Sequence, residues 1–198
     1  MSDAEFDNGR ESRSAMDVMG VVFETRAPVS WFPLHNVLTS MELAEINQRV
    51  ESVLHTVAGL DDQRIPLSDD ASPIVQELAR LDFKLSLLLD LVGDLASRSL
   101  DRPPLRRIQI GARSVVWEDS CENVPAVDSW GKVELWIHPS YAHALSLPGR
   151  IKSVQEAGEL ARITAALSGL GESAQEMLER WIFLHHRRAV AHERPGKV

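Results

Sequence analysis

The sequence predicts an α+β protein in which a small antiparallel β-barrel accompanies two long heptad-repeat helices. Three observations predict this class. Helix-start signals and heptads mark two long helices between residues 39 and 100. From Arg106 onward, apolar and polar residues alternate with period two, as in a barrel wall. A last helix is indicated near the C-terminus, starting at Ser173.

The composition bounds the function. The chain has 198 residues, of which 44% are apolar, and a net charge of −8. The apolar share supports a sizeable core, and the negative charge disfavours nucleic-acid binding, so an anion site would need a local basic patch. Cys121 is the only cysteine. With no apolar signal segment and no run of 18 apolar residues, we expect a cytoplasmic protein without membrane insertion.

The N-terminal region divides in two. Residues 1–17 are polar and read as a disordered tail. Residues 18–38 are apolar and β-prone but contain two prolines, which predicts a short strand or an extended arm lying on the domain.

The first helix is expected over residues 39–58. Thr39 and Glu42 have the spacing of a capping box, and Gly59 should end the helix before a linker that reaches residue 71. Its apolar positions recur with gaps of three and four: Leu43, Ile46, Val50, Val53 and Val57.

The second helix is expected over residues 72–100. Ser72 is a good N-cap, Pro73 suits the first helical position, and Pro103-Pro104 follows the helix. Its apolar residues keep a strict 3.5-residue repeat, typical of a coiled coil rather than of a single surface helix. They are Ile74, Leu78, Leu81, Leu85, Leu88, Val92 and Leu95, which we call the seam.

The seam predicts self-association. Each leucine taken out of water contributes about 1.5–3 kcal/mol, so an open stripe would be costly. Leu87, Leu89 and Leu91 widen the apolar face, which favours three or more helices. We expect the first helix to fold back on the second, so that several chains form an intersubunit bundle of at least four helices: a tetramer, with a dimer as the alternative. The competing interpretation is a core helix of one domain.

The remaining elements follow from the period-two pattern and turn residues. Asp128–Gly131 and Leu147–Gly149 are expected to be turns. In the last helix, Glu176 would complete a capping box with Ser173, Met177, Leu178, Trp181 and Ile182 would be buried, and His185–Arg188 would form its end. The predicted strands are Arg106–Ile110, Arg113–Glu118, Lys132–His138, Ala144–Val154 and Ala161–Leu167.

Few residues point to chemistry. Adjacent His185 and His186 face about 100° apart on a helix, so with His192 they favour a cationic helix end over a metal site; the alternative is that Arg187 and Arg188 grip an acidic partner or a phosphate. The tryptophans are expected in the core or an interface, with Trp117 as the candidate if one stacks on a base. No catalytic triad, phosphate loop or metal-ligand spacing occurs in the sequence.

Four strings in order carry a resemblance to a known family. They are LARLDFKLSLLL (78–89), IQIGARSVVW (108–117), LSLPGRI (145–151) and IFLHHRR (182–188). Over residues 18–192 the chain resembles the atypical PilZ family of bacterial cyclic-di-GMP signalling. The resemblance implies a PilZ-type barrel and C-terminal helix over residues 101–192 and a helical oligomerisation insertion over residues 39–100. It also implies tetramers zippered through the heptads.

Ordinary PilZ domains bind cyclic-di-GMP through Arg-x-x-x-Arg and Asp/Asn-x-Ser-x-x-Gly motifs. Arg102 and Arg106 match the first motif by spacing, and Arg107 adds charge. In the second, Gln109, Gly111 and Ser114 stand where Asp or Asn, Ser and Gly are expected. The resemblance therefore implies the fold more firmly than the ligand.

The prediction is a non-enzymatic signalling adaptor without metal or resident cofactor. Besides itself, it would bind signalling or pilus-assembly proteins in motility or virulence pathways, and not nucleic acid; the pathway rests on the resemblance alone. The alternative is a true cyclic-di-GMP receptor that uses Arg102, Arg106 and Arg107 with an altered guanine pocket, for which Gln109, Ser114 and Trp117 are the candidates.

Overall fold

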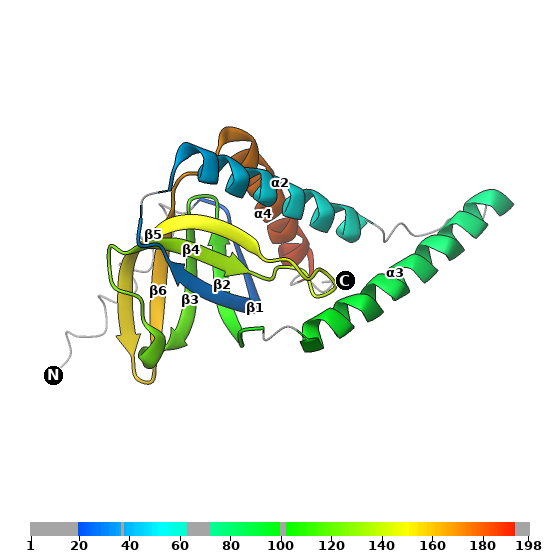
Figure 1. The fold of residues 1–198 in the computed structure, drawn as a ribbon. Coiled ribbons are helices and arrows are strands. Elements are labelled where there is room, and N and C mark those ends of the chain that lie inside the picture. Colours follow the sequence, from blue (N-terminus) through cyan, green and yellow to red (C-terminus); the bar gives the residue numbers. More distant parts are fainter. Residues whose placement is uncertain (1–19, 37, 63–71, 100–101, 193–198) are drawn as a thin grey trace.

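A computed structural model describes residues 20–36, 38–62, 72–99 and 102–192. Six antiparallel strands close into a barrel in the order β1-β2-β3-β6-β5-β4, and three helices accompany it (Figure 1). The α+β class is therefore confirmed. The strands are β1 (Val22–Pro33), β2 (Leu105–Gly111), β3 (Ser114–Ser120), β4 (Trp130–Leu135), β5 (Leu145–Ala157) and β6 (Leu160–Leu167). The helices are α2 (Ser40–Asp62), α3 (Pro73–Ser99) and α4 (Glu172–His192).

The N-terminal segment is a full wall strand rather than a short strand or an arm. Strand β1 pairs with β2 through residues 22–28 and with β4 through residues 29–33, so it closes the barrel. Pro28 is tolerated because it lies where β1 leaves one partner for the other, and its carbonyl still accepts the Trp136 amide at 3.1 Å. The barrel therefore needs residues beyond the predicted 101–192 unit. The predicted tail, residues 1–17, lies outside the described residues.

Two details of the predicted strands are wrong. Strand β4 ends at Leu135 rather than His138, because the chain turns and the Trp136 indole donates to the Ala142 carbonyl at 3.1 Å. The expected turn at Leu147–Gly149 lies inside β5. Glycine is needed there because a Cβ on Gly149 would lie 2.5 Å from the Ala166 oxygen of the neighbouring strand β6.

Helix α2 begins as predicted and ends later. The Thr39 amide donates to Glu42 Oε2 at 2.8 Å and the Glu42 amide donates to Thr39 Oγ1 at 3.3 Å, which completes the capping box. The helix continues through Gly59 to Asp62. The extra turn is held by Asp61, whose Oδ2 lies 3.0 Å from His185 Nε2 of α4.

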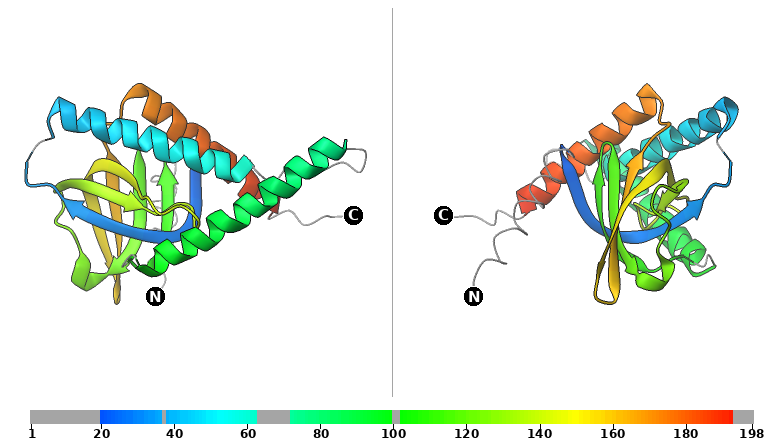
Figure 2. Two further views of the ribbon diagram at one scale, coloured as in Figure 1. Left: turned by 45° about the vertical axis from the view of Figure 1, so that its right-hand side comes forward. Right: turned by 90° about the vertical axis from the view of Figure 1, so that its left-hand side faces the viewer.

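The apolar stripe of α2 packs on its own chain, which corrects its assignment to the intersubunit bundle. Val50, Val53 and Val57 are 0–2% exposed and belong to one core cluster with the barrel and α4. Ile46 packs against this cluster, and Leu43 lies beside the loop before α4, close to Gly169. Figure 2 shows α2 and α4 crossing over the same end of the barrel. The stripe therefore caps the barrel.

Helix α4 buries the predicted residues but starts one residue early. Leu178, Trp181 and Ile182 are 0–4% exposed, and Met177 packs against the core. The Gln175 amide donates to the Gly171 carbonyl, so the helix starts at Glu172 and Ser173 lies inside it rather than at the cap. The helix then runs past His185–Arg188 to His192. These four residues are therefore interior to the helix and not its last turn.

Helix α3 projects from the barrel (Figure 1). As predicted, its start is capped: the Gln76 amide donates to the Ser72 carbonyl at 3.0 Å, and the Val75 amide lies 3.5 Å from Ser72 Oγ. Its C-terminal part is held close to the barrel, because Gly93 is buried against the backbone of Ser140. Within this chain α3 is not the core helix of one domain.

Candidate functional sites: the seam of α3 and two charged pockets

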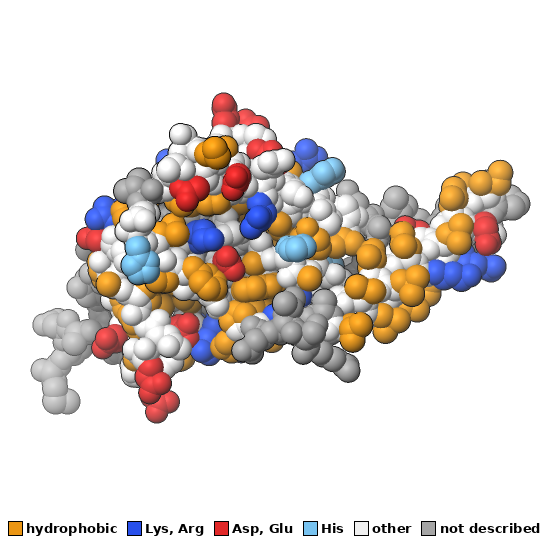
Figure 3. Space-filling view, viewed as in Figure 1, with side chains coloured by type: hydrophobic (Ala, Val, Ile, Leu, Met, Phe, Trp, Pro, Cys, Tyr) orange, Lys and Arg blue, Asp and Glu red, His pale blue; other side chains and the backbone are white. Residues whose placement is uncertain are grey.

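The seam of α3 is an apolar surface that the described residues leave open. Figure 3 shows hydrophobic side chains along the projecting helix. All seven seam side chains face solvent, with exposed fractions from 52% to 73%: Ile74, Leu78, Leu81, Leu85, Leu88, Val92 and Leu95. A contiguous apolar patch of this kind marks an interaction surface.

Glycine at position 93 sets how closely α3 approaches the barrel. A Cβ added there would lie 2.6 Å from Cα of Ser140 and 2.9 Å from its carbonyl oxygen. The helix backbone therefore rests directly on the loop that joins β4 to β5. This contact lies at the C-terminal end of the seam, next to Val92.

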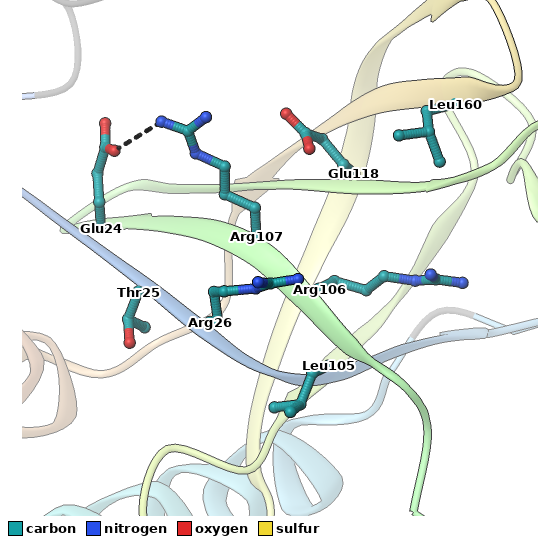
Figure 4. Close-up of a pocket in the computed structure, with 8 residues that line it drawn as sticks. All are labelled: Glu24, Thr25, Arg26, Leu105, Arg106, Arg107, Glu118 and Leu160. Atoms are coloured by element: carbon teal, nitrogen blue, oxygen red, sulfur yellow. Dashed lines mark hydrogen bonds and ion pairs between the residues drawn. The ribbon is translucent and has the colours of Figure 1, made fainter.

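The arginines of the predicted Arg-x-x-x-Arg motif, with Arg107, do not form one site. Arg106 Nη2 pairs with Asp119 Oδ1 at 2.8 Å, and Arg107 Nη2 lies 3.4 Å from Glu24 Oε2. Both line a shallow hollow of about 450 Å³ on the outside of β1, β2 and β3 (Figure 4). Arg102 does not line this hollow; it donates instead to the Tyr141 carbonyl, 3.3 Å away, in another pocket. The structure therefore does not bring the three arginines together.

The predicted guanine pocket is not assembled either. Gln109 is held between Glu24, 2.7 Å away, and Arg162, 2.8 Å away. Trp117 cannot offer a stacking face, because it is 2% exposed and lies against Trp31 in the core, with ring centroids 6.3 Å apart. Ser114 is half-buried at the start of β3, paired with Ala166.

Two further arginines belong to this outer face, which we missed in the sequence. Arg26 is the cross-strand partner of Arg107, and Arg162 is the cross-strand partner of Glu118. Period-two alternation could have placed Arg107 on the outer face, opposite the buried Ile108. The partner strands, however, follow only from the barrel order.

His185 and His186 connect α4 to α2 and β1, and they do not form a cationic C-terminal end of the helix. Asp61 Oδ2 accepts from His185 Nε2 at 3.0 Å and lies 3.8 Å from Arg188 Nη1, while His186 Nδ1 lies 2.9 Å from the Val22 carbonyl. Burial disfavours the charge on Asp61, but the hydrogen bond from His185 and nearby positive charges outweigh it, so the pKa of Asp61 is lowered. The described residues contain no group of three or more potential metal-ligating side chains.

A second pocket, of about 580 Å³, lies between α2 and the barrel, and we call it the α2 pocket. Arg49 of α2 and Arg102 line it together with Glu134, Tyr141 and Ser146. Ser146 and Glu134 are paired on β5 and β4 and therefore point to the same side of the sheet. Only Arg102 of these residues was a candidate from the sequence.

A comparison with curated protein sequences finds no match. A crystal structure of a pathogenic protein from Xanthomonas campestris is similar, with a TM-score of 0.68 and 22% sequence identity. The similarity covers 92% of this chain and 99% of that chain. That protein is described as a new tetrameric PilZ domain self-assembled via an unusual helical bundle.

A family model gives the assignment. The model of the atypical PilZ domain, described as a cyclic di-GMP receptor, matches residues 54–195, which include the end of α2, all of α3 and five of the six barrel strands. No helix within the described residues has both the length and the apolar character needed to cross a membrane. By its family match and its closed barrel, the chain belongs to the atypical PilZ domain family.

Proposed function

We propose that this chain is a non-enzymatic adaptor of cyclic-di-GMP-linked signalling in the cytoplasm, which assembles into a tetramer through α3. One observation carries the proposal: seven apolar side chains of α3 form an unbroken heptad seam that stays more than half exposed in the single chain. The seam side chains can be buried only by contact with another apolar surface.

The geometry of α3 favours copies of itself as that surface. A 3.5-residue repeat keeps one stripe in contact with a partner helix over the whole length of a coiled coil. Leu91, 58% exposed, and the half-buried Leu89 flank the seam and give a face wider than a two-stranded coil uses. The solved PilZ neighbour, which assembles through a helical bundle as a tetramer, supports the same arrangement here.

The charged pockets favour an adaptor over a receptor of the ordinary PilZ type. Arg106 and Arg107 are paired with carboxylates, Arg102 is in another pocket, and Trp117 is buried. A ligand that required all three arginines would first have to break two ion pairs. We therefore propose that the barrels bind other proteins, such as signalling or pilus-assembly components, rather than cyclic-di-GMP in the usual way.

A receptor remains the second candidate, and one observation favours it. Arg26, Arg107 and Arg162 share the outer face of the barrel around the shallow hollow, where only Glu24 and Glu118 oppose them among the residues that the structure describes. A local basic patch of this kind is what an anionic dinucleotide would require.

The assembly is tested by the mass of the protein in solution. Light scattering on the 22.0 kDa chain is expected to give the mass of four copies. The double variant Leu85→Asp, Leu88→Asp is expected to give one copy, because each substitution would bury an unpaired charge in the bundle. Phe83→Asp is the control, since Phe83 is also exposed, at 69%, and lies on the opposite side of α3. A full oligomer from the double variant would contradict the proposal.

The choice between adaptor and receptor is tested by calorimetric titration with cyclic-di-GMP. We expect no saturable heat at micromolar ligand. Saturation that disappears in Arg106→Ala and in Arg107→Gln would replace the adaptor by the receptor. Arg107 is the safer position for folding because its side chain is 63% exposed. Arg180→Gln, an exposed arginine on α4, serves as the control.

A further inference from the structure

The α2 pocket is a second charged cavity, apart from the seam and the outer arginine face. It lies between α2 and the outer side of β4 and β5, and it holds about 580 Å³. Val53 and Trp136 contribute apolar wall. The Trp136 indole is already satisfied by the Ala142 carbonyl at 3.1 Å, so it offers a surface rather than a donor.

The charge in the α2 pocket is positive in a chain whose net charge is −8. Arg49 comes from α2 and Arg102 from the segment before β2. Glu134 is the acidic side chain among the lining residues, and Lys132 Nζ lies 3.9 Å from its Oε1 and balances part of its charge. No carboxylate of the described residues forms an ion pair with Arg49 or Arg102. Two guanidinium groups from different elements thus line the pocket with one carboxylate, and neither forms an ion pair with that carboxylate among the described residues.

Two buried polar groups of the pocket have no partner. Ser146 is 8% exposed, and its Oγ forms no hydrogen bond with any described residue. The Nε of Arg102 is likewise buried and unbonded, although its Nη2 donates to the Tyr141 carbonyl. Buried donors in folded proteins are nearly always bonded, to protein, water or ligand. Both residues line the pocket, and a hydroxyl or a guanidinium N–H is able to donate to an oxyanion.

We propose that the α2 pocket binds a small organic anion through a phosphate or carboxylate group. The planar forks of Arg49 and Arg102 suit either group, and Ser146 Oγ supplies a third donor. Val53 and Trp136 would cover the apolar part of the ligand. This site does not depend on the proposed assembly through α3.

The position of the pocket ties it to the root of α3. Arg102 follows α3 in the chain and donates to the Tyr141 carbonyl. The residue before Tyr141, Ser140, packs against Gly93 of α3. An anion held by Arg102 would therefore contact the segment that positions the projecting helix.

Calorimetric titration of the full chain tests the site with phenyl phosphate as the probe, in competition with benzoate and inorganic phosphate. We expect saturable binding that Arg49→Gln weakens about tenfold or more, the effect of losing one charge-assisted hydrogen bond. Ser146→Ala is expected to weaken binding several-fold. Competition by benzoate alone assigns a carboxylate ligand, and competition by inorganic phosphate alone assigns a phosphate.

Controls keep the result unambiguous. Arg107→Gln on the outer barrel face should leave the affinity unchanged, and unfolding curves should show that Arg49→Gln folds, since Arg49 is exposed. The proposal is overturned if phenyl phosphate fails to saturate up to about 10 mM. It is equally overturned if binding survives Arg49→Gln and Ser146→Ala but is lost in Arg107→Gln.

Discussion

Helices α2 and α3 carry the same sequence signal and have opposite environments. Both are long, both begin at a capped residue, and both repeat apolar residues with gaps of three and four. Yet Val50, Val53, Leu54 and Val57 of α2 are 0–2% exposed in the core, whereas the seam of α3 stays open. Periodicity therefore tells which face of a helix is apolar, and it does not tell which surface covers that face.

The difference follows from what lies next to each helix. Helix α2 has only five stripe residues, and the barrel end and α4 supply a surface long enough to cover them. Asn47 fixes it there, since its amide donates to the Gly169 carbonyl at 3.1 Å and its Oδ1 accepts the Gly171 amide at 2.8 Å. Helix α3 instead projects from the barrel (Figure 1), and its backbone approaches the barrel closely at Gly93, against Ser140.

The two helices are expected to differ most in how much the free energy of unfolding falls when one leucine in each is truncated to alanine. Leu54→Ala should lower the free energy of unfolding by about 2–5 kcal/mol, because it leaves a cavity in a closed core. Leu88→Ala, 58% exposed in the single chain, should change it by less than about 0.5 kcal/mol at concentrations where the chain is monomeric. Denaturant unfolding at low and high protein concentration measures both. Equal losses at low concentration would mean that the seam is packed within one chain.

The two helix glycines sharpen the comparison. Gly93→Ala should cost about 1–3 kcal/mol through overpacking, since the added Cβ would meet the backbone of Ser140 at 2.6 Å. Gly59→Ala should instead stabilise by about 0.5–1 kcal/mol, because nothing lies within 4 Å of its Cβ position. Unfolding midpoints report the second change, and amide exchange of the loop around Ser140 reports the first. A neutral Gly93→Ala would show that α3 does not bear on that loop.

A small effect that depends on pH is expected at the end of α2. The folded pKa of Asp61 lies below its ordinary value, so its contacts add stability at neutral pH and lose it as the pH falls through that lowered pKa. Asp61→Asn should cost about 1 kcal/mol at pH 7 and flatten the fall of stability in acid. Thermal unfolding from pH 7 to pH 2 measures this. If the stability difference between the wild type and the variant does not change with pH, the charge of Asp61 does not have this role.

Local signals predicted the fold well. Thr39 with Glu42, and Ser72, marked the helix starts, and the alternation after Arg106 marked the barrel wall. The predictions that failed depended on contacts between residues far apart in the sequence. Pro28 argued against a central strand until β1 was seen to change partners there, and the need for Gly149 comes from the approach of Ala166.

The candidate sites were less predictable for the same reason. Spacing in the chain linked Arg102 with Arg106, but they line different pockets because the chain passes from the root of α3 into the barrel wall between them. The α2 pocket joins Arg49 to Ser146, almost a hundred residues apart, and neither position lies in a motif. Ser146 stands out because its hydroxyl is buried without a hydrogen-bond partner, and this can be recognised only in the folded structure.

The attachment of α3 near Gly93 has a consequence for avidity. A rod of 27 residues, about 40 Å long, would hold each barrel at the rim of a central bundle with its outer wall turned to solvent. A target carrying several copies of one weak recognition element could then engage several barrels at once. The first contact would raise the local concentration for the next to about the millimolar range, so individually transient contacts would add up to durable capture.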